Sequence, residues 1–293
     1  MDLTARPLGC TRSFVLLAPA RVCLEPFHGE IREDQSEFQD LMGKMQRLRG
    51  GVYLRDGAIQ PSDLTNDRRH VSRLDKDSWH LLTVCGDGRV VGCARILPHS
   101  NSASFEALTV SHSAIAKCPE WGAQLRSSIE AERQRAHGSD FLWLEMGGWA
   151  LSEELRGTTE ALLYALATYA WSQLMGGAIG ISTATERNGS ASILRRLGGV
   201  SLEHKGAALP AYYDPKYRCQ MEVLRFDSRI PNLKYAATVE SLRSQMALVP
   251  VVSAKTSADW DLDLKETYLP GTIAPQGYWL NASRAHAQDA HIY

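Results

Sequence analysis

The sequence predicts one three-layer α/β or α+β domain, in which helices cover a mixed sheet. Two apolar runs joined by Gly86-Asp87-Gly88 are typical of a β-hairpin, whose strands are antiparallel. Further along, a long apolar helix lies between two strand-like runs, and this order indicates that the two strands pair in parallel. A chain of 293 residues can bury such a core without disulfides or metals.

Hydrophobic periodicity places the elements in order. Residues 36–49 carry apolar side chains at i, i+3, i+4 and i+7, which predicts an amphipathic helix that ends at Gly50-Gly51. Residues 1–34 are expected to be irregular, apart from one apolar run. Strands are predicted at 79–85, 90–97, 141–150, 178–184 and 219–226, and helices at 121–137, 157–175, 190–197 and 235–248.

The composition excludes several classes of protein. The 32 Lys and Arg residues balance 33 Asp and Glu, so the basic excess needed for non-specific nucleic-acid binding is missing. No run reaches the ~18 apolar residues of a transmembrane helix. The run at 14–18 resembles a signal-peptide core, but Pro19 interrupts it, and we expect a cytoplasmic protein. The six cysteines form no CxxC pair, so no metal site is expected, and Cys85 and Cys93 are expected to be buried apolar residues.

The segment that follows the strand at 141–150 could bind an anion. A glycine-containing turn that opens a helix presents free backbone N–H groups and the positive end of the helix dipole. Arg156 adds a positive charge beside this turn. A phosphate or pyrophosphate would suit such a site. The alternative is an ordinary helix start, in which Gly157 only permits close packing.

Glu145 is the candidate general base. By strand alternation it shares a face with Phe141, Trp143, Gly147 and Trp149. A carboxylate among large apolar side chains is desolvated, which raises its pKa toward the range of a general base. The alternative is a buried carboxylate that pairs with an arginine such as Arg95.

Arg95 lies inside an apolar run, where an arginine either pairs with a carboxylate or faces a site. Asp75 and Glu145 are the candidate partners. His80 lies near the start of a strand, where a hydrogen-bonded structural histidine is more common than a catalytic one. The motifs GxSxG, HExxH, GxGxxG and GxxxxGK[ST] are absent, which disfavours serine hydrolases, zinc proteases, Rossmann dehydrogenases and P-loop NTPases.

Three stretches between residues 36 and 227 resemble the motifs of one enzyme superfamily. Arg47-Leu-Arg-Gly-Gly-Val-Tyr53 is similar to an Arg-x-x-x-Phe/Tyr motif at the end of a first helix. Asp75-Lys-Asp-Ser-Trp-His80 and the hairpin Gly88-Arg-Val-Val-Gly-Cys-Ala-Arg-Ile-Leu-Pro98 resemble Asp-x-x-x-x-His and Val-Val-Gly-x-x-Arg-Leu-x-Pro. Leu144-Glu-Met-Gly-Gly-Trp-Ala-Leu-Ser152 with Leu155-Arg-Gly157 resembles a Glu-x-Gly-Arg-Trp-Ala-Val strand and the Arg-Gly turn after it. By these motifs the chain resembles the GCN5-related N-acyltransferase (GNAT) superfamily, and within it the bacterial long-chain N-acyl amino acid synthases, cousins of the acyl-homoserine-lactone autoinducer synthases.

The resemblance implies an architecture and a pair of substrates. The expected fold is a GNAT-like mixed, mostly antiparallel sheet with a central splay and helices on both faces. Its domains are an N-terminal extension at 1–35, an acyltransferase domain at 36–227 and a C-terminal extension at 228–293 packed on the core. The implied donor is a medium-to-long acyl thioester on the 4′-phosphopantetheine of acyl carrier protein, or on coenzyme A, with no tightly bound cofactor. The implied acceptor is a small amine such as an amino acid.

The resemblance also implies the site. Its catalytic residues would be Glu145, Arg49, Arg95, Asp75 and His80. Its donor-binding residues would be Gly148, Trp149, Ala150, Leu151, Arg156, Gly157, Thr158 and Thr159. In this scheme the amine attacks the thioester directly, Glu145 is the base, a backbone N–H near 148–150 polarises the thioester oxygen, and Arg49 or Arg95 holds an acceptor carboxylate.

An apolar slot for the acyl chain is expected near the splay. The large residues expected around it are Phe141, Trp143, Trp149, Leu163, Leu166 and Trp171, most of which must also form the core. The alternatives to this function are an acyl-homoserine-lactone-type synthase, a short-chain acyl-CoA N-acetyltransferase, and a non-enzymatic sensor of acyl ligands.

Overall fold

The computed structural model describes residues 11–20, 22, 24, 29–187 and 189–254. The strands are β1 (Arg12–Leu17), β2 (Ile31–Glu33), β3 (Trp79–Cys85), β4 (Val90–His99), β5 (Leu142–Leu151), β6 (Ala178–Thr185), β7 (Val200–Ser201), β8 (Glu203–His204), β9 (Ala207–Ala208), β10 (Tyr212–Asp214), β11 (Cys219–Asp227) and β12 (Val251–Ser253). The α-helices are α1 (Gln35–Arg55), α2 (Gly122–Gly138), α3 (Glu160–Leu174), α4 (Ser190–Leu197) and α5 (Ala236–Met246). One sheet has the order β10-β11-β6-β5-β4-β3-β1-β12-β2, with β7 beside β11, and β8 and β9 form a separate pair.

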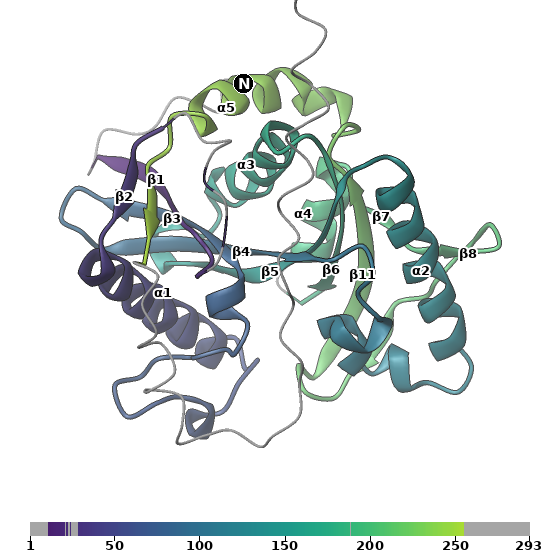
Figure 1. Ribbon diagram of the computed structural model, residues 1–293. Coiled ribbons are helices and arrows are strands. Elements are labelled where there is room, and N and C mark those ends of the chain that lie inside the picture. Colours follow the sequence, from purple (N-terminus) through teal and green to yellow (C-terminus); the bar gives the residue numbers. More distant parts are fainter. Residues whose placement is uncertain (1–10, 21, 23, 25–28, 188, 255–293) are drawn as a thin grey trace, which may run out of the picture.

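Helices cover both faces of the main sheet (Figure 1). On one face, Leu144 and Ala178 belong to the apolar cluster formed with α3, α4 and α5. On the other face, Trp143 and Ile179 pack with α2, and Leu82 packs with α1. Because neighbouring residues of a strand point to opposite faces, both sides of the central strands are buried. The predicted three-layer α/β class is therefore confirmed.

The sheet opens between β5 and β6, as the resemblance implied. These strands pair in parallel only where Leu142–Glu145 lies beside Ala178–Ile181. The other edge of β5 stays paired with β4 as far as Leu151. Beyond Glu145 the two strands part, and the neighbouring pairs on either side are antiparallel. The mixed, mostly antiparallel sheet with a central splay is confirmed.

Most predicted elements occur within three residues of their expected bounds. The first helix is the exception at its end, because α1 passes through Gly50-Gly51 and continues to Arg55. A Cβ on Gly50 would lie 2.9 Å from Leu64 Cδ2, so this glycine permits a loop to pack against the helix rather than ending it. The helix ends before Gly57, whose φ of 69° suits glycine.

The N-terminal segment is not an extension of the domain. Residues 12–17, which include most of the apolar run in the segment otherwise expected to be irregular, form β1, which pairs with β3 and β12 inside the sheet. Leu16 and Leu17 are fully buried, one on each face. The predicted boundary at residue 36 therefore does not separate a structural unit.

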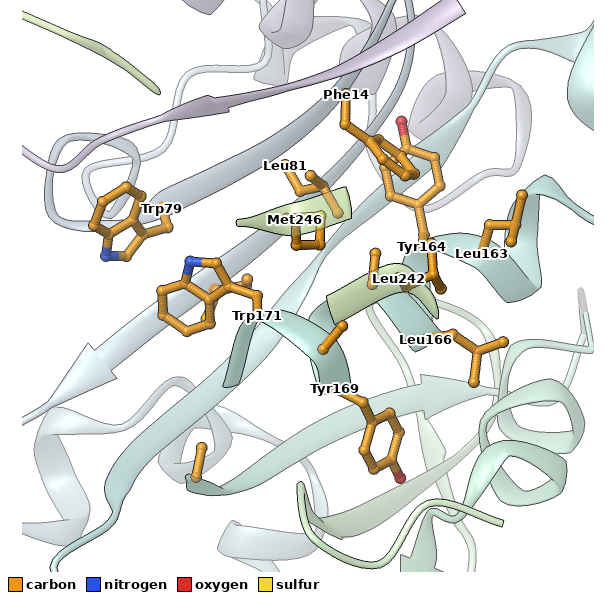
Figure 2. Close-up of a cluster of buried hydrophobic side chains, with 14 of the residues drawn as sticks. Phe14, Trp79, Leu81, Leu163, Tyr164, Leu166, Tyr169, Trp171, Leu242 and Met246 are labelled. Carbon is orange, nitrogen blue, oxygen red and sulfur yellow. The ribbon is translucent and has the colours of Figure 1, made fainter. Parts of the chain in front are cut away.

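The segment after residue 228 packs on the core, as far as it is described. Helix α5 lies over α3 in Figure 1, and its Val239, Leu242 and Met246 join the cluster beneath it. Figure 2 shows Trp79 beside Trp171, with ring centroids 5.8 Å apart. Strand β12 then adds to the sheet between β1 and β2. Residues 255–293 lie outside the described part of the chain. Across the described residues, we find no helix with the length and apolar character needed to cross a membrane.

Candidate active site

A β-bulge at Gly148 decides which side chains face the splay. Arg95 pairs with Gly147 and Cys93 with Ala150, so β5 has one residue more than β4 between these pairs. The φ of Gly148 is 63°, and a Cβ there would lie 2.8 Å from Arg95 Cβ, so the position requires glycine. The extra residue reverses the alternation. Trp149 therefore lies on the α3 face, opposite Glu145, so its predicted place beside Glu145 is wrong, whereas Phe141 and Trp143 lie on the face of Glu145 as predicted.

Glu145 is a buried structural carboxylate in this geometry. Its two oxygens accept hydrogen bonds from His99 Nε2 at 2.9 Å, Thr109 N at 2.8 Å, Thr109 Oγ1 at 2.7 Å and Val110 N at 3.1 Å. Burial alone would raise its pKa, but the bonds from His99 and Thr109 outweigh burial, and the pKa is lowered. The predicted rise in the pKa of Glu145 is wrong, because no sequence pattern indicated that His99, Thr109 and Val110 would donate hydrogen bonds to it. Arg95 is not the partner of this carboxylate.

We expect Glu145→Gln to lower the free energy of unfolding by about 1–3 kcal/mol, because an amide NH₂ would face buried N–H and O–H donors. Urea denaturation measures this, and Glu106→Gln in the same segment is the control. Glu106 is exposed and pairs with Arg126, so its replacement should leave stability nearly unchanged. If Glu145→Gln instead kept full stability and lowered turnover ~10²-fold, the carboxylate would be a general base after all.

Arg49 and Asp75 form a buried ion pair between α1 and the loop before β3. Arg49 Nη1 donates to Asp75 Oδ1 at 2.9 Å, and Arg49 Nη2 donates to Asp75 Oδ2 at 2.7 Å. Only 1% of Arg49 and 4% of Asp75 is exposed. Burial raises the pKa of Asp75, but the bonds and charge of Arg49 outweigh it and hold the pKa at about 2. The third guanidinium bond of Arg49 goes from Nη2 to the carbonyl of His70 at 2.6 Å. Arg49 is therefore bonded to structural partners, and its guanidinium is not free to make a bidentate bond to a substrate.

His80 belongs to the same cluster. Its Nε2 lies 2.9 Å from the carbonyl oxygen of Asp75, and since that oxygen can only accept, Nε2 carries the proton. Burial lowers the pKa of His80 to about 4, so the ring is neutral at pH 7. The structural role that the sequence favoured for His80 fits this geometry. Asp75 pairs with Arg49 and not with Arg95, for which the sequence had offered it as a partner.

Arg95 has no such partner. Its side chain is on the α1 face, opposite His80 on β3 and Gly147 on β5. Neither Asp75 nor Glu145 bonds to it, and among the described residues no hydrogen bond or ion pair reaches its guanidinium. Its Nε is buried and unbonded. Burial is the main cause of the lowered pKa of His80, and the nearby charge of Arg95 lowers it further. The Arg95 guanidinium is thus a cation at the edge of the splay without a partner among the described residues.

A cavity of about 650 Å³, part of it open to solvent, lies under α3 at the splay. We call it the acyl cavity. One end is formed by Arg95, Gly147, Trp149 and Ser182, and the other by Ser172, Ala178 and Ser228. Between them lie mostly apolar or small side chains: Leu144, Met146, Ala165, Tyr169, Gly180, Leu194 and Phe226. The four steps along β6 from Ala178 to Ser182 span roughly 13 Å, so the cavity is elongated.

Most of the large residues expected near the slot belong to the core, as the sequence analysis expected of most of them. Of the large residues expected there, only Trp149 lines the acyl cavity. Trp143, Leu166 and Trp171 are fully buried core residues. The cavity exists because small residues, Ala178, Gly180 and Ser182, alternate along one face of β6. A run of small residues at alternate positions was the sequence signal that could have indicated it.

The predicted donor-binding residues differ in the groups that they leave available for hydrogen bonds. Beyond Glu145, the edge of β5 that faces the splay is unpaired, so the backbone of residues 148–151 is open there. The side chains of Ala150 and Leu151 belong to apolar clusters instead. The Thr158 hydroxyl closes the turn by donating to the carbonyl of Leu155 at 2.7 Å. Gly157 (φ 71°) and Thr159 have backbone N–H groups with no hydrogen-bond partner in the described residues.

Arg156 is held by a residue that the sequence did not indicate. Its Nη2 donates to both carboxylate oxygens of Asp56, at 2.6 Å each. Arg187 Nη1 donates to the Asp56 carbonyl at 2.9 Å. The end of α1 is thus bonded to the turn before α3 and to the turn after β6. A donor phosphate at this turn would have to compete with Asp56 for Arg156.

The remaining candidate groups are the cysteine thiols and the side chains that could bind a metal. Cys93 and Cys85 are buried, as predicted. Burial raises the pKa of Cys93 to about 12, and its Sγ donates to the carbonyl of Gly148 at 3.4 Å. Cys93 is therefore a neutral thiol and a poor nucleophile. Over the residues described here, no three His, Cys, Asp or Glu side chains come together as a metal site.

The comparisons with known proteins support the fold. No protein-family model matches the chain, and no curated protein matches it in sequence. Among solved structures it is similar to a CoA-dependent acyl-homoserine lactone synthase, BjaI, solved with SAM and isopentyl-CoA. The identity is 16% over 84% of this chain and 94% of that one, with a TM-score of 0.51. It is also similar to FeeM, an N-acyl amino acid synthase from uncultured soil microbes, with 10% identity over 75% and 93% of the two chains and a TM-score of 0.45. The chain has the GNAT-like acyltransferase fold that the sequence motifs implied.

Proposed function

We propose that the chain is an N-acyltransferase that moves a medium-to-long acyl group from a phosphopantetheine thioester to the amine of an amino acid or a related small amine. The observation that carries the proposal is the acyl cavity. It is elongated, mostly apolar and begins where β5 and β6 part. A two-carbon acyl group would contact little of this apolar lining, whereas each methylene of a longer chain gains ~0.8 kcal/mol by burial.

The donor would lie along the open edge of β5. The unpaired backbone of residues 148–151 can bond the amide groups of a pantetheine arm, as an added strand does. The phosphate would then reach the turn at 156–159, where Gly157 and Thr159 offer free N–H groups before α3. Glu154 lies beside this turn and disfavours a second phosphate, so acyl carrier protein is the proposed carrier in preference to coenzyme A.

The acceptor would approach from the α1 face, where Arg95 is unpaired. A carboxylate bound by its guanidinium would place the amine of an amino acid near the bulge at Gly148. The amine nitrogen attacks the thioester carbon, the carbon–sulfur bond breaks, and the amine proton ends on the released thiol. A backbone N–H in the bulge would stabilise the oxyanion. Cys93 is a protonated, buried thiol, which supports direct attack rather than an acyl-enzyme.

We expect cells that express the protein to accumulate amide-linked acyl amino acids whose chains differ by two methylenes. Mass spectrometry of lipid extracts detects them, with cells that express Arg95→Met as the control. Kinetics of the purified protein with C2–C16 thioesters should show a maximum among the longer chains. A flat profile or a maximum at C2 would favour the acetyltransferase alternative. An acyl-homoserine lactone as product would favour the lactone-synthase alternative, and binding of acyl chains without turnover would indicate a sensor.

A further inference from the structure

A second hollow lies beside the end of the acyl cavity that Ser172, Ala178 and Ser228 form. We call it the rear hollow. It is lined by Gln173, Arg229, Ile230, Pro231, Leu233, Ala236, Val239 and Glu240, and its volume is about 490 Å³, including space open to solvent. Ile230 is 65% exposed and Leu233 is 90% exposed. The rear hollow therefore opens on an apolar part of the surface, next to the start of α5.

The acyl cavity and the rear hollow are lined by neighbouring residues of the same two segments, which form the wall between them. Ser172 and Ser228 line the acyl cavity, and the residues that follow them in the chain, Gln173 and Arg229, line the rear hollow. Gln173 Nε2 donates to the backbone carbonyl of Ser228 at 2.8 Å. The Ser228 hydroxyl is fixed in turn, because it accepts from Ala178 N at 2.9 Å. The Gln173–Ser228 bond thus joins α3 to the end of β11 across the wall.

Tyr169 forms the other part of this wall. It lines the acyl cavity, and in Figure 2 its hydroxyl points away from the Trp79–Trp171 pair. A Cβ on Gly198 would lie 2.8 Å from this hydroxyl and 3.1 Å from the carbonyl oxygen of Ile230, so Tyr169 reaches toward the segment that lines the rear hollow. Its ring is held by an edge contact with Phe226, with centroids 6.1 Å apart. Tyr169 is therefore fixed by packing, whereas a single neutral hydrogen bond holds Gln173.

We propose that Gln173 determines the longest acyl chain that the site accepts. Its side chain, which the hydrogen bond to Ser228 positions, separates the acyl cavity from the rear hollow by its bulk, and a shorter side chain at this position would join the two. This inference rests on the proposed acyl-transfer function. Binding should tighten with each methylene that the cavity buries, by about fourfold, which corresponds to ~0.8 kcal/mol. Beyond the wall, an added methylene gains nothing.

The test is the binding of saturated fatty acids from C6 to C18, followed by intrinsic tryptophan fluorescence, to which Trp149 in the lining of the acyl cavity contributes. In the wild-type protein, affinity should rise about fourfold per methylene and then level off. In Gln173→Ala, short chains should bind as in the wild type, while the levelling-off should move to chains at least two carbons longer. The acyl-thioester profile for turnover should move by the same number of carbons.

Two further variants keep the outcome clear. Gln173→Leu retains a side chain of similar size without the hydrogen bond, and we expect it to keep the wild-type limit. Gln134→Ala on α2 removes an exposed glutamine that bonds only to Glu130, and it controls for the loss of a helical amide. Identical chain-length limits in the wild type and Gln173→Ala would overturn the role of Gln173 and leave the acyl cavity intact. Absence of binding by the wild type at every length would overturn the proposed function itself, and the role of Gln173 with it.

Discussion

Replacing Asp75 by Asn is expected to lower the free energy of unfolding by about 3–5 kcal/mol, because the buried guanidinium of Arg49 would lose its only carboxylate among the described residues. Both side chains are at most 4% exposed, so water cannot replace the lost charge. Domains of this kind are stable by only about 5–15 kcal/mol, and the variant should therefore lose a large share of its stability. Urea denaturation followed by circular dichroism measures the loss.

The control for this prediction is Asp67→Asn on the same loop. Hydrogen bonds from Thr65 and Arg69 also hold the pKa of Asp67 at about 2, but this carboxylate is exposed. Solvent can take over its interactions, so we expect stability to change little. A second variant, Arg49→Met combined with Asp75→Asn, should recover part of the loss, because no buried charge is left unpaired. A loss in Asp75→Asn no larger than that in Asp67→Asn would contradict the prediction.

Local patterns predicted the central elements of the fold, but not the strands that depend on distant partners. The Gly86-Asp87-Gly88 turn is local, and the hairpin β3–β4 formed where it was expected. Strand β1 was missed because its run is short and apolar on both faces, a pattern that fits a strand, a buried helix segment or a signal-peptide core. What makes it a strand is its position between β3 and β12, and β12 begins more than 230 residues later in the chain.

The sequence indicated which types of residue the site would contain, but not which of them bond to one another. The sequence offered Asp75 and Glu145 as partners for Arg95, but Asp75 bonds to Arg49 from α1 and Glu145 bonds to Thr109. Thr109 lies in a stretch of short turns without hydrophobic periodicity, so no pattern connected it to β5. The bulge at Gly148 is a second case. A Gly-Gly pair in a strand permits a bulge without requiring one, and the bulge alone moves Trp149 to the other face of the sheet.

Replacing Arg95 by Met is expected to raise the KM for a carboxylate-bearing acceptor about 10- to 100-fold, because a charge-assisted hydrogen bond contributes ~1.5–3 kcal/mol and ~1.4 kcal/mol is a factor of ten. The turnover number should change little, since the carboxylate is bound equally in the ground and transition states. Arg95→Lys should recover part of the loss, because an ammonium keeps the charge without the two-pronged geometry. Arg89→Met on the same hairpin is the control, as Arg89 is exposed and pairs with Asp87.

Two measurements distinguish this binding role of Arg95 from a structural one. The first uses the amide of the same acceptor amino acid, which lacks the carboxylate. The wild type should bind the amide as weakly as Arg95→Met binds the amino acid. The variant should bind the amide and the amino acid equally. The second is stability: Arg95 has no partner in the described part of the chain and a buried, unbonded Nε, so Arg95→Met should unfold at the same urea concentration as the wild type or a higher one. A variant with reduced stability and an unchanged acceptor KM would show that Arg95 supports the fold and that the acceptor carboxylate binds elsewhere.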